Sequence, residues 1–394
     1  MLYTFPVQFT DLPTPQVLVD RARLFANIER MQAAADAHRV RLRPHAKTHK
    51  IPAIARWQMD RGAVGICCAK IGEAEVFADA GIEDIRLPYP VNPRNADRLL
   101  ALMDRCRVSI IVDHPAVARG WSDVMRGAGR RLDVLVKVDV GSHRCGIDPG
   151  HLNAPAALGA PPWPGGLEFV RLVSALPGLR LRGLLSHAGH SYGATSRQAL
   201  AAVAKEEAGL LCALADEARG NGISINEISV GATPTSPFVE AGVTELRPGT
   251  YVYFDRTQVA LGVAGLQNCA LTVLAMVVSK PACDRIVLDC GSKTLTNDPP
   301  HGFLHPHEKP RGFGAVFADL DATALADDLT VERLSEEHAV VSVASGSTPL
   351  EPGDLVRVLP NHVCPVSNLV DCVRLIEGRE VVETLTVAAR GKIS

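Results

Sequence analysis

The chain has 394 residues, 47% of them hydrophobic and 21% charged, and a formal net charge of -2. This length exceeds that of one ordinary domain, and the composition is that of a globular protein with a sizeable core. The near-neutral charge argues against nucleic acid as a partner, and no apolar run is long enough to predict a membrane-spanning helix.

The compartment is predicted from the cysteines and the N-terminus. The ten cysteines are scattered, and only Cys67 and Cys68 are adjacent. The first residues lack the basic and apolar regions of a signal peptide. Both features predict reduced thiols in a cytoplasmic protein whose partner is a small molecule.

Short apolar runs alternate with helix-sized segments over the first two-thirds of the chain. The candidate strands are Val40–Leu42, Val64–Cys67, Ile82–Leu87, Val108–Val112, Val134–Val138, Leu181–Leu185, Ile225–Val230 and Glu245–Val252. The amphipathic segments between them include Arg23–His38, Ile71–Ala80, Asn95–Arg105, Pro164–Leu176 and Ser196–Gly220. This order predicts an α/β protein with a (β/α)8 TIM barrel over residues 12–258. A doubly wound sheet also fits the alternation, but it would place a Gly-rich turn after the first strand.

A different pattern begins at residue 259. The runs there are short, β-branched and interrupted by Gly and Pro: Ala270–Val278, Arg285–Leu288, Ala339–Val343, Leu355–Val358, Arg374–Glu377 and Glu380–Val387. They predict a C-terminal, mostly-β domain over residues 259–394, with residues 1–11 packing on it. The segment His301–Gly314 is expected to be a polar loop.

A basic octapeptide, Arg-Pro-His-Ala-Lys-Thr-His-Lys, follows the first candidate strand at residues 43–50. Burying a lysine is costly unless it is paired or neutralised, and a neutral lysine is a base or a Schiff-base nucleophile. The alternative is an exposed, solvated basic loop.

Two loops with small and hydroxylated residues follow the last two candidate strands of the barrel, at Ser229–Ser236 and Arg247–Tyr251. TIM barrels commonly bind phosphate after strands seven and eight, where small residues let backbone N–H groups approach the anion. Each loop alone could be an ordinary turn. Together with Lys47 they suggest pyridoxal phosphate, whose aldehyde condenses with a lysine amine.

These motifs, with Asp139–Gly146 and Ser186–Tyr192, resemble the D-serine dehydratase and D-threonine aldolase family of fold type III pyridoxal enzymes, the alanine-racemase-like group. The resemblance extends from Asp11 to Pro365. It implies that Lys47 binds the cofactor covalently and that the protein is a homodimer. It also implies a set of further cofactor-binding residues: Arg144, His187, Tyr192, Gly231, Thr233, Gly249, Thr250 and Tyr251. Without it, Arg144 would be read as a surface residue and His187 as a core histidine.

His362 and Cys364 form a second candidate site. In an extended chain, residues i and i+2 point to one side, so the imidazole and the thiolate could bind one metal. A buried Cys beside a structural His is the alternative. The resemblance implies a metal site here, and a thiolate selects Zn2+, whereas Mn2+ or Mg2+ accompanies a carboxylate at this position.

These features predict a metal-dependent lyase acting on a β-hydroxy D-amino acid. A dehydratase that gives a 2-oxo acid and ammonia is the main interpretation. Retro-aldol cleavage, as in a D-threonine or 3-hydroxy-D-aspartate aldolase, uses the same residues and is the first alternative. A non-catalytic pyridoxal-phosphate homeostasis protein is the second, although such proteins resemble an isolated barrel.

Overall fold

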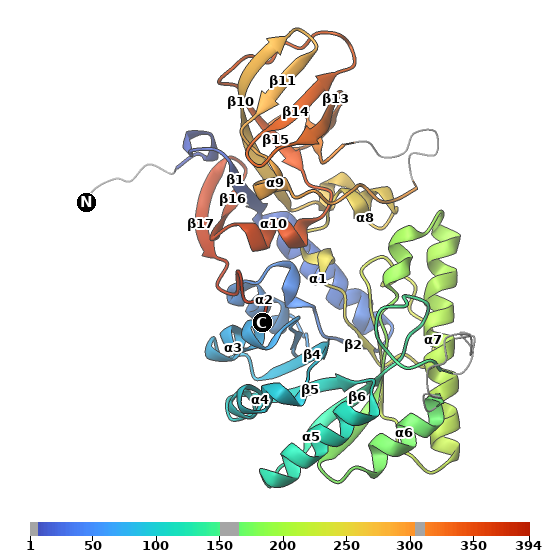
Figure 1. Ribbon diagram of the computed structural model, residues 1–394. Coiled ribbons are helices and arrows are strands. Elements are labelled where there is room, and N and C mark those ends of the chain that lie inside the picture. Colours follow the sequence, from blue (N-terminus) through green and yellow to red (C-terminus); the bar gives the residue numbers. More distant parts are fainter. Residues whose placement is uncertain (1–6, 150–164, 304–311) are drawn as a thin grey trace.

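A computed structural model describes residues 7–149, 165–303 and 312–394 of the chain. It shows two β-structures stacked end to end (Figure 1). The first is a barrel surrounded by helices, and the second is an antiparallel β domain above it. Within the described residues, no helix is long and apolar enough to cross a membrane.

The barrel is an 8-stranded parallel sheet in the order β2-β9-β8-β7-β6-β5-β4-β3. A parallel bridge between His45 and Cys67 joins β2 to β3, so the sheet closes on itself. The strands are β2 Arg41–Leu42, β3 Ile66–Cys67, β4 Asp84–Pro90, β5 Arg107–Val112, β6 Leu132–Lys137, β7 Leu179–Leu185, β8 Glu227–Val230 and β9 Glu245–Leu246. The expected TIM-barrel fold is therefore confirmed.

Helices cover the outside of this barrel. They are α1 Arg21–Ala37, α2 Pro52–Asp60, α3 Ile71–Asp79, α4 Ala96–Met103, α5 Pro115–Gly127, α6 Gly166–Ala175 and α7 Arg197–Gly220. Their first turns are capped as the sequence allows: Asp20 accepts from the Arg23 N–H and Ser196 from the Ala199 N–H. One buried apolar cluster, which includes Phe77, Leu99 and Trp121, packs the helices against the strands.

The β domain is built on a 9-stranded sheet in the order β11-β14-β13-β12-β15-β10-β1-β16-β17, with a further pairing between β11 and β10. Its strands are β10 Leu271–Ala282, β11 Arg285–Leu288, β12 Ala315–Phe317, β13 Leu325–Leu334, β14 Ala339–Val343, β15 Leu355–Leu359, β16 Cys372–Glu377 and β17 Glu380–Thr386. The short helices α8 Arg256–Ala260, α9 Ser292–Leu295 and α10 Val363–Leu369 accompany them. The mostly-β second region is confirmed.

The N-terminal segment differs from the expected start of the barrel at residue 12. Strand β1, Gln16–Asp20, pairs with β10 and β16 and so belongs to the β domain. Before it, Phe9 is fully buried against Leu18 and Ile376 of the same domain. The chain leaves the β domain after β1 and enters the barrel through α1. It returns to the β domain at β10, after the last barrel strand. Of the expected loop His301–Gly314, residues 304–311 lie outside the described residues.

Candidate active site

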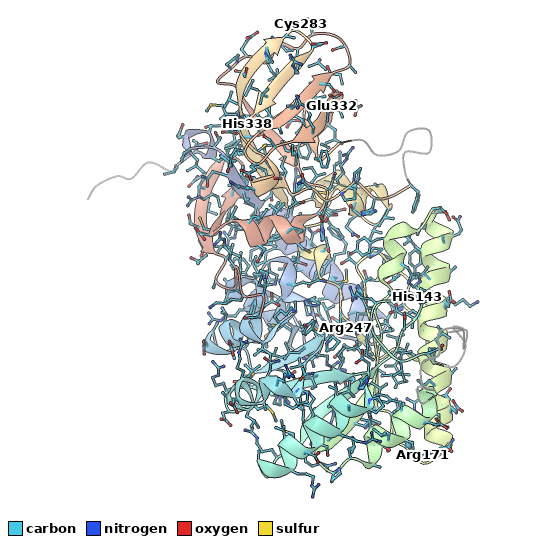
Figure 2. The ribbon with its side chains drawn as sticks, in the orientation of Figure 1. His143, Arg171, Arg247, Cys283, Glu332 and His338 are labelled. Atoms are coloured by element: carbon cyan, nitrogen blue, oxygen red, sulfur yellow. The ribbon has the colours of Figure 1, made fainter. Side chains whose placement is uncertain are left out.

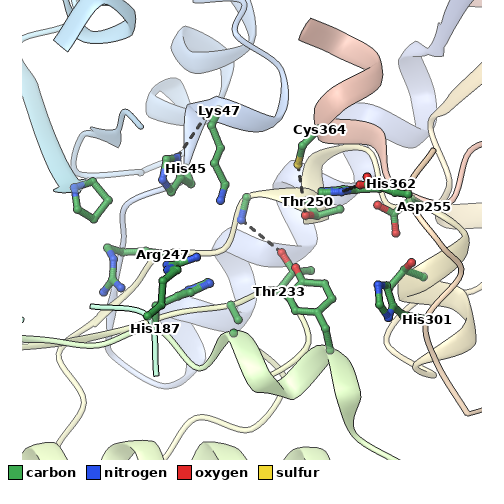
Figure 3. Close-up of a pocket in the computed structure, with 18 of the residues that line it drawn as sticks. His45, Lys47, His187, Thr233, Arg247, Thr250, Asp255, His301, His362 and Cys364 are labelled. Carbon is green, nitrogen blue, oxygen red and sulfur yellow. Dashed lines mark hydrogen bonds and ion pairs between the residues drawn. The ribbon is translucent and has the colours of Figure 1, made fainter. Parts of the chain in front are cut away.

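A cavity of about 320 Å³ lies where the C-terminal ends of the barrel strands face the β domain (Figure 3). Most of the residues expected in the site line it: Lys47, Arg144, His187, Tyr192, Thr233, Gly249, Thr250, His362 and Cys364. The structure therefore brings the lysine, the small-residue loops and the His–Cys pair to one space, although they are up to about 300 residues apart in the chain.

Lys47 lies in a 3-10 turn, Ala46–Thr48, that begins a few residues after the end of β2. The His45 side chain begins this turn by accepting a hydrogen bond from the Lys47 N–H at 3.4 Å. Burial, followed by the charge of Lys47, lowers the pKa of His45 well below its usual value, so this imidazole is neutral and can accept. The turn directs the Lys47 side chain into the cavity.

Lys50, the other lysine of the basic octapeptide, is directed away from the cavity. Its Nζ lies 3.1 Å from Glu73 Oε1 and 3.4 Å from the Ala389 carbonyl oxygen. Lys50 is therefore a paired structural lysine, and Lys47 is the lysine of this segment that faces the cavity.

The two small-residue loops lie side by side after β8 and β9. The Gly249 N–H donates to Thr233 Oγ1 at 3.3 Å, which ties the loops together. A Cβ atom at Gly249 would lie 2.9 Å from Thr48 Oγ1, and one at Gly231 would lie 3.0 Å from the Arg247 backbone N and Cβ. Glycine is needed at both positions because the neighbouring chain is so close.

His187 follows β7 and lines the cavity beside these loops. Its Nδ1 lies 2.5 Å from the Gly231 carbonyl oxygen, which can only accept, so Nδ1 carries the proton. Burial, followed by the charge of Lys47, lowers the pKa of His187 well below its usual value. His187 is thus a neutral imidazole whose Nε2 remains an acceptor. Gly231 supports the site through this bond and does not line the cavity itself.

Tyr251 does not lie where a cofactor-binding residue is expected. The strand expected over Glu245–Val252 ends at Leu246, and Thr250–Val252 form a 3-10 turn. Pro248 has no N–H to continue the strand. The turn directs Tyr251 into the protein core, where its side chain is fully buried and its Oη accepts from Gln58 Nε2 at 2.9 Å. Its neighbour Thr250 faces the cavity.

His362 and Cys364 both line the cavity, but the backbone between them is not extended as expected. His362 is the extended N-cap of α10, and Cys364 lies in the first turn of that helix. The first N–H of α10, from Val363, donates to Asp255 Oδ2 at 3.2 Å, and Asp255 Oδ1 accepts from the Gln258 N–H at 3.0 Å. One buried carboxylate thus holds the N-termini of α8 and α10 beside the cavity.

Polar side chains hold both members of the pair. His362 Nδ1 lies 2.5 Å from Asp298 Oδ2, and the imidazole also interacts with Cys364. Thr48 Oγ1, from the turn that carries Lys47, lies 3.2 Å from Cys364 Sγ, and Thr250 Oγ1 lies 3.8 Å from it. The hydroxyl groups therefore connect Cys364 to the Lys47 turn and to one small-residue loop. Figure 3 shows the contact with Thr250.

His362 and Cys364 stabilise each other as an imidazolium and a thiolate, so a metal that bound both groups would displace the imidazole proton. Burial opposes charge on His362, but the Cys364 thiolate raises the pKa of the imidazole to about 10. Burial also acts to raise the pKa of the Cys364 thiol, yet the facing His362 lowers it below its usual value. The thiolate form that a metal requires is therefore favoured. Across the described residues, no group of three or more His, Cys, Asp and Glu side chains has metal-site geometry.

Sequence reasoning missed several residues of the cavity wall. Lys137 ends β6, Asp298 follows α9, and Arg247, Asp255 and His301 also line the cavity. Figure 2 places Arg247 among the side chains inside the barrel. Lys137 had a local signal, because it is a lone charge within the apolar run Val134–Val138. Asp298 had none, since its partner His362 is 64 residues away.

Comparisons with known proteins agree with this architecture. Residues 19–257 match the alanine racemase N-terminal domain, and residues 270–376 match the putative serine dehydratase domain. The chain is 35% identical to the D-threonine aldolase of Arthrobacter sp. over 386 residues, covering 96% of this chain and 93% of the relative. It is 33% identical to the D-threo-3-hydroxyaspartate dehydratase of Delftia sp. (strain HT23) over 364 residues, covering 90% and 91%.

A solved structure is also similar over nearly its whole length. It is a cysteine-to-alanine mutant of D-threo-3-hydroxyaspartate dehydratase in the metal-free form, with a TM-score of 0.87, 30% identity and coverage of 96% of this chain and 98% of that one. The fold and the site define an alanine-racemase-like pyridoxal-phosphate protein. The chain belongs to the D-serine dehydratase and D-threonine aldolase family, whose members named above are lyases.

Proposed function

We propose that this protein is a pyridoxal-phosphate- and metal-dependent lyase that removes water from a β-hydroxy D-amino acid. Hydrolysis of the released enamine then gives a 2-oxo acid and ammonia. The observation that carries the proposal is the position of Lys47 and of the His362–Cys364 pair on the walls of one cavity, connected by the contact between Thr48 and Cys364. A substrate whose Cα amine takes the place of the Lys47 amine would present its β-hydroxyl to the pair.

The residues fit pyridoxal phosphate. Lys47 supplies the amine for the aldehyde, and the loops that contain Thr233, Gly249 and Thr250 line the cavity with small and hydroxylated residues that suit a phosphate. His187, Tyr192 and Arg144 would contact the ring or the substrate. When bound, the cofactor supplies an electron sink for the charge that develops at Cα.

The donor set fits a metal ion. His362 Nε2 and Cys364 Sγ would hold it, and a soft thiolate favours Zn2+ over Mn2+ or Mg2+. When bound, the metal supplies Lewis-acid assistance to the departing hydroxide, which is otherwise a poor leaving group. Asp298 would act as a positioning residue, because its carboxylate accepts from His362 Nδ1 and so reserves Nε2 for the metal.

The protein's own groups supply the proton transfers. Once the substrate amine has displaced Lys47, the freed Lys47 Nζ is the base for the Cα proton. Neutral His187 keeps its orientation through the bond to the Gly231 carbonyl and places no positive charge beside Lys47. The β domain covers the barrel mouth and restricts water there.

Two alternatives differ in chemistry. The 35% identity to a D-threonine aldolase favours retro-aldol cleavage as the second candidate, in which a base takes the β-hydroxyl proton and the Cα–Cβ bond breaks. A non-catalytic homeostasis protein is disfavoured, because the β domain contributes His362 and Cys364 to the cavity. A cytoplasmic homodimer is part of the proposal and rests on the family resemblance and the ten free thiols.

The test is product analysis. The protein loaded with pyridoxal phosphate and zinc is incubated with D-serine, D-threonine and 3-hydroxy-D-aspartate, and 2-oxo acid is measured against aldehyde. The proposal expects 2-oxo acid and ammonia in equal amounts. Aldehyde with glycine would establish the aldolase instead, and no product from any of the three would refute a lyase of this class.

A further inference from the structure

Lys137 is a buried lysine for which the proposed mechanism has no use. It is the last residue of β6, its side chain is only 3% exposed, and it lines the same cavity as Lys47. Within the described residues its Nζ makes no hydrogen bond and no ion pair. A buried ammonium group without a partner is unfavourable, so a fold that keeps one at a cavity wall indicates a ligand.

No carboxylate forms an ion pair with Lys137 among the described residues, although Cys145 and Glu207 both act to raise its pKa. Glu207 on α7 is the carboxylate that acts to raise the pKa of Lys137. However, Ser186 Oγ donates a hydrogen bond to Glu207 at 2.5 Å, and burial raises the pKa of Glu207. Arg247 is also positively charged and therefore disfavours the charged form of Lys137. Its guanidinium donates to Ser229 Oγ at 2.6 Å. Burial, with Arg247, lowers the pKa of Lys137 to about 7.

A second cation converges on the same space. Arg144 lines the cavity from the loop after β6, and among the described residues its guanidinium has no hydrogen-bond or ion-pair partner. The loop is held by Asp139 Oδ1, which accepts from the Gly141 N–H at 3.0 Å and the His143 N–H at 3.1 Å. The buried Lys137 and the exposed Arg144 thus line one cavity, and neither has an ion-pair partner among the described residues.

The position of this pair indicates which anion it takes. The loops suited to phosphate lie after β8 and β9, whereas Lys137 and Arg144 belong to β6 and its loop. A β-hydroxy amino acid carries its own carboxylate, and an amine beside a guanidinium is a favourable receptor for it.

We propose that Lys137 is a specificity-determining residue that binds a carboxylate of the amino-acid substrate, together with Arg144. This inference rests on the proposed function. The carboxylate is either the α-carboxylate common to all amino acids or a β-carboxylate, as in 3-hydroxyaspartate. The substrate series separates the two.

The test compares Lys137→Met, Lys137→Arg and the exposed control Lys205→Met in the cofactor-loaded protein. Loss of a charged hydrogen bond to substrate should raise KM about 10- to 100-fold in Lys137→Met, with a much smaller change in kcat. Lys137→Arg should recover most of the loss, and Lys205→Met should match the wild type. A rise for D-serine, D-threonine and 3-hydroxy-D-aspartate alike assigns the α-carboxylate, and a rise confined to 3-hydroxy-D-aspartate assigns the β-carboxylate.

A binding measurement keeps this inference separate from the proposed function. D-malate and D-lactate carry carboxylates but no amine to react with the cofactor, so their affinities can be measured calorimetrically even if no substrate is turned over. Weaker binding to Lys137→Met, and to Lys137→Gln if the Met variant does not take up cofactor, supports the inference. Unchanged KM and unchanged affinity would overturn it. So would a shift of the cofactor absorbance without ligand, because Lys137 would then contact the cofactor.

Discussion

At the floor of the barrel, around Glu245, the buried cations are paired with acids, whereas Lys47, Lys137 and Arg144, which line the cavity at the mouth, have no such partners among the described residues. At the floor, Glu245 accepts from Arg43 Nε at 2.9 Å and from Arg86, and Ser229 Oγ donates to it at 2.6 Å. Arg86 Nη2 also donates to Glu227 at 2.7 Å. Every one of these charges faces an opposite charge within the chain.

At the mouth, the cations Lys47, Lys137 and Arg144 line the cavity, and none of them has an ion pair among the described residues. The acids there interact with other groups. Asp255 accepts from the first N–H of α10, and Asp298 contacts His362 Nδ1. The comparison teaches that charge is balanced where the barrel needs stability. It is left unbalanced where an anionic cofactor and substrate complete the structure.

Lys47→Ala is the change at the mouth with the largest expected effect on activity. It removes the amine that would bind the cofactor, so turnover should fall about 10⁴-fold or more, as for other catalytic nucleophiles. Stability should change little, because Lys47 is only half-buried. Borohydride reduction and peptide mapping of the wild type should place the label on Lys47. A label on Lys50, Lys70 or Lys137 would contradict the assignment.

Glu245→Gln should have the largest effect at the floor. It leaves two buried guanidinium groups short of a counter-charge, so the free energy of unfolding should fall by about 3–5 kcal/mol. Burial acts to raise the pKa of Glu245, but Arg86 and Arg43 hold it at about 2, below the ordinary value of 4.5. The contribution is therefore full above pH 4.5 and is lost as the pH falls towards 2.

Denaturant unfolding at a series of pH values checks this prediction. The difference between wild type and Glu245→Gln should narrow below pH 4.5. The exposed substitution Glu383→Gln is the control and should change stability by less than about 0.5 kcal/mol. A small loss at neutral pH would show that the floor network is not a stabilising element.

Asp298→Asn should have an intermediate effect, confined to the metal. Replacing the charged acceptor of His362 Nδ1 should weaken zinc binding about 10- to 100-fold. Competition with a chelator measures the affinity, and the absorbance of the cofactor on Lys47 should not change. Asp327→Asn, an exposed position, is the control. Equal zinc affinity in Asp298→Asn would mean that Asp298 does not orient His362.

Tyr251→Phe is the smallest of these changes. It removes the hydroxyl that accepts from Gln58, at a cost of about 1–2 kcal/mol in unfolding free energy. The affinity for pyridoxal phosphate should stay the same, because Tyr251 lies in the core. A clear loss of cofactor affinity would restore the cofactor-binding role that the sequence suggests for this residue.

The sequence predicts the parts of the fold whose signal is local. Each barrel strand overlaps one of the expected runs, because most residues of these strands are buried and apolar. Strand β1 was missed because only its pairing with β10 and β16 places it in the β domain. Strand β13 was missed because few of its residues are buried, so no apolar alternation marks it.

The residues of the site also divide into those with a local signal in the sequence and those without one. Lys47, Thr233 and Cys364 lie in motifs that can be recognised from the sequence, and all three line the cavity. Asp298 and Asp255 act through contacts with α10, and nothing near them in the sequence indicates those contacts. Tyr251 lies in a motif that resembles the family, so the sequence suggests that it lines the site. Its side chain lies in the core instead, because β9 ends early and Tyr251 belongs to a 3-10 turn.

The central claim is that Lys47 and the His362–Cys364 pair act on one substrate in one cavity, and metal removal tests it most directly. The cofactor-loaded protein is treated with a chelator, and its absorbance and turnover of β-hydroxy D-amino acids are recorded before and after zinc is restored. The account predicts that turnover is lost and regained while the absorbance of the cofactor on Lys47 is unchanged. Full activity of the metal-free protein would contradict it and would leave His362 and Cys364 as structural residues.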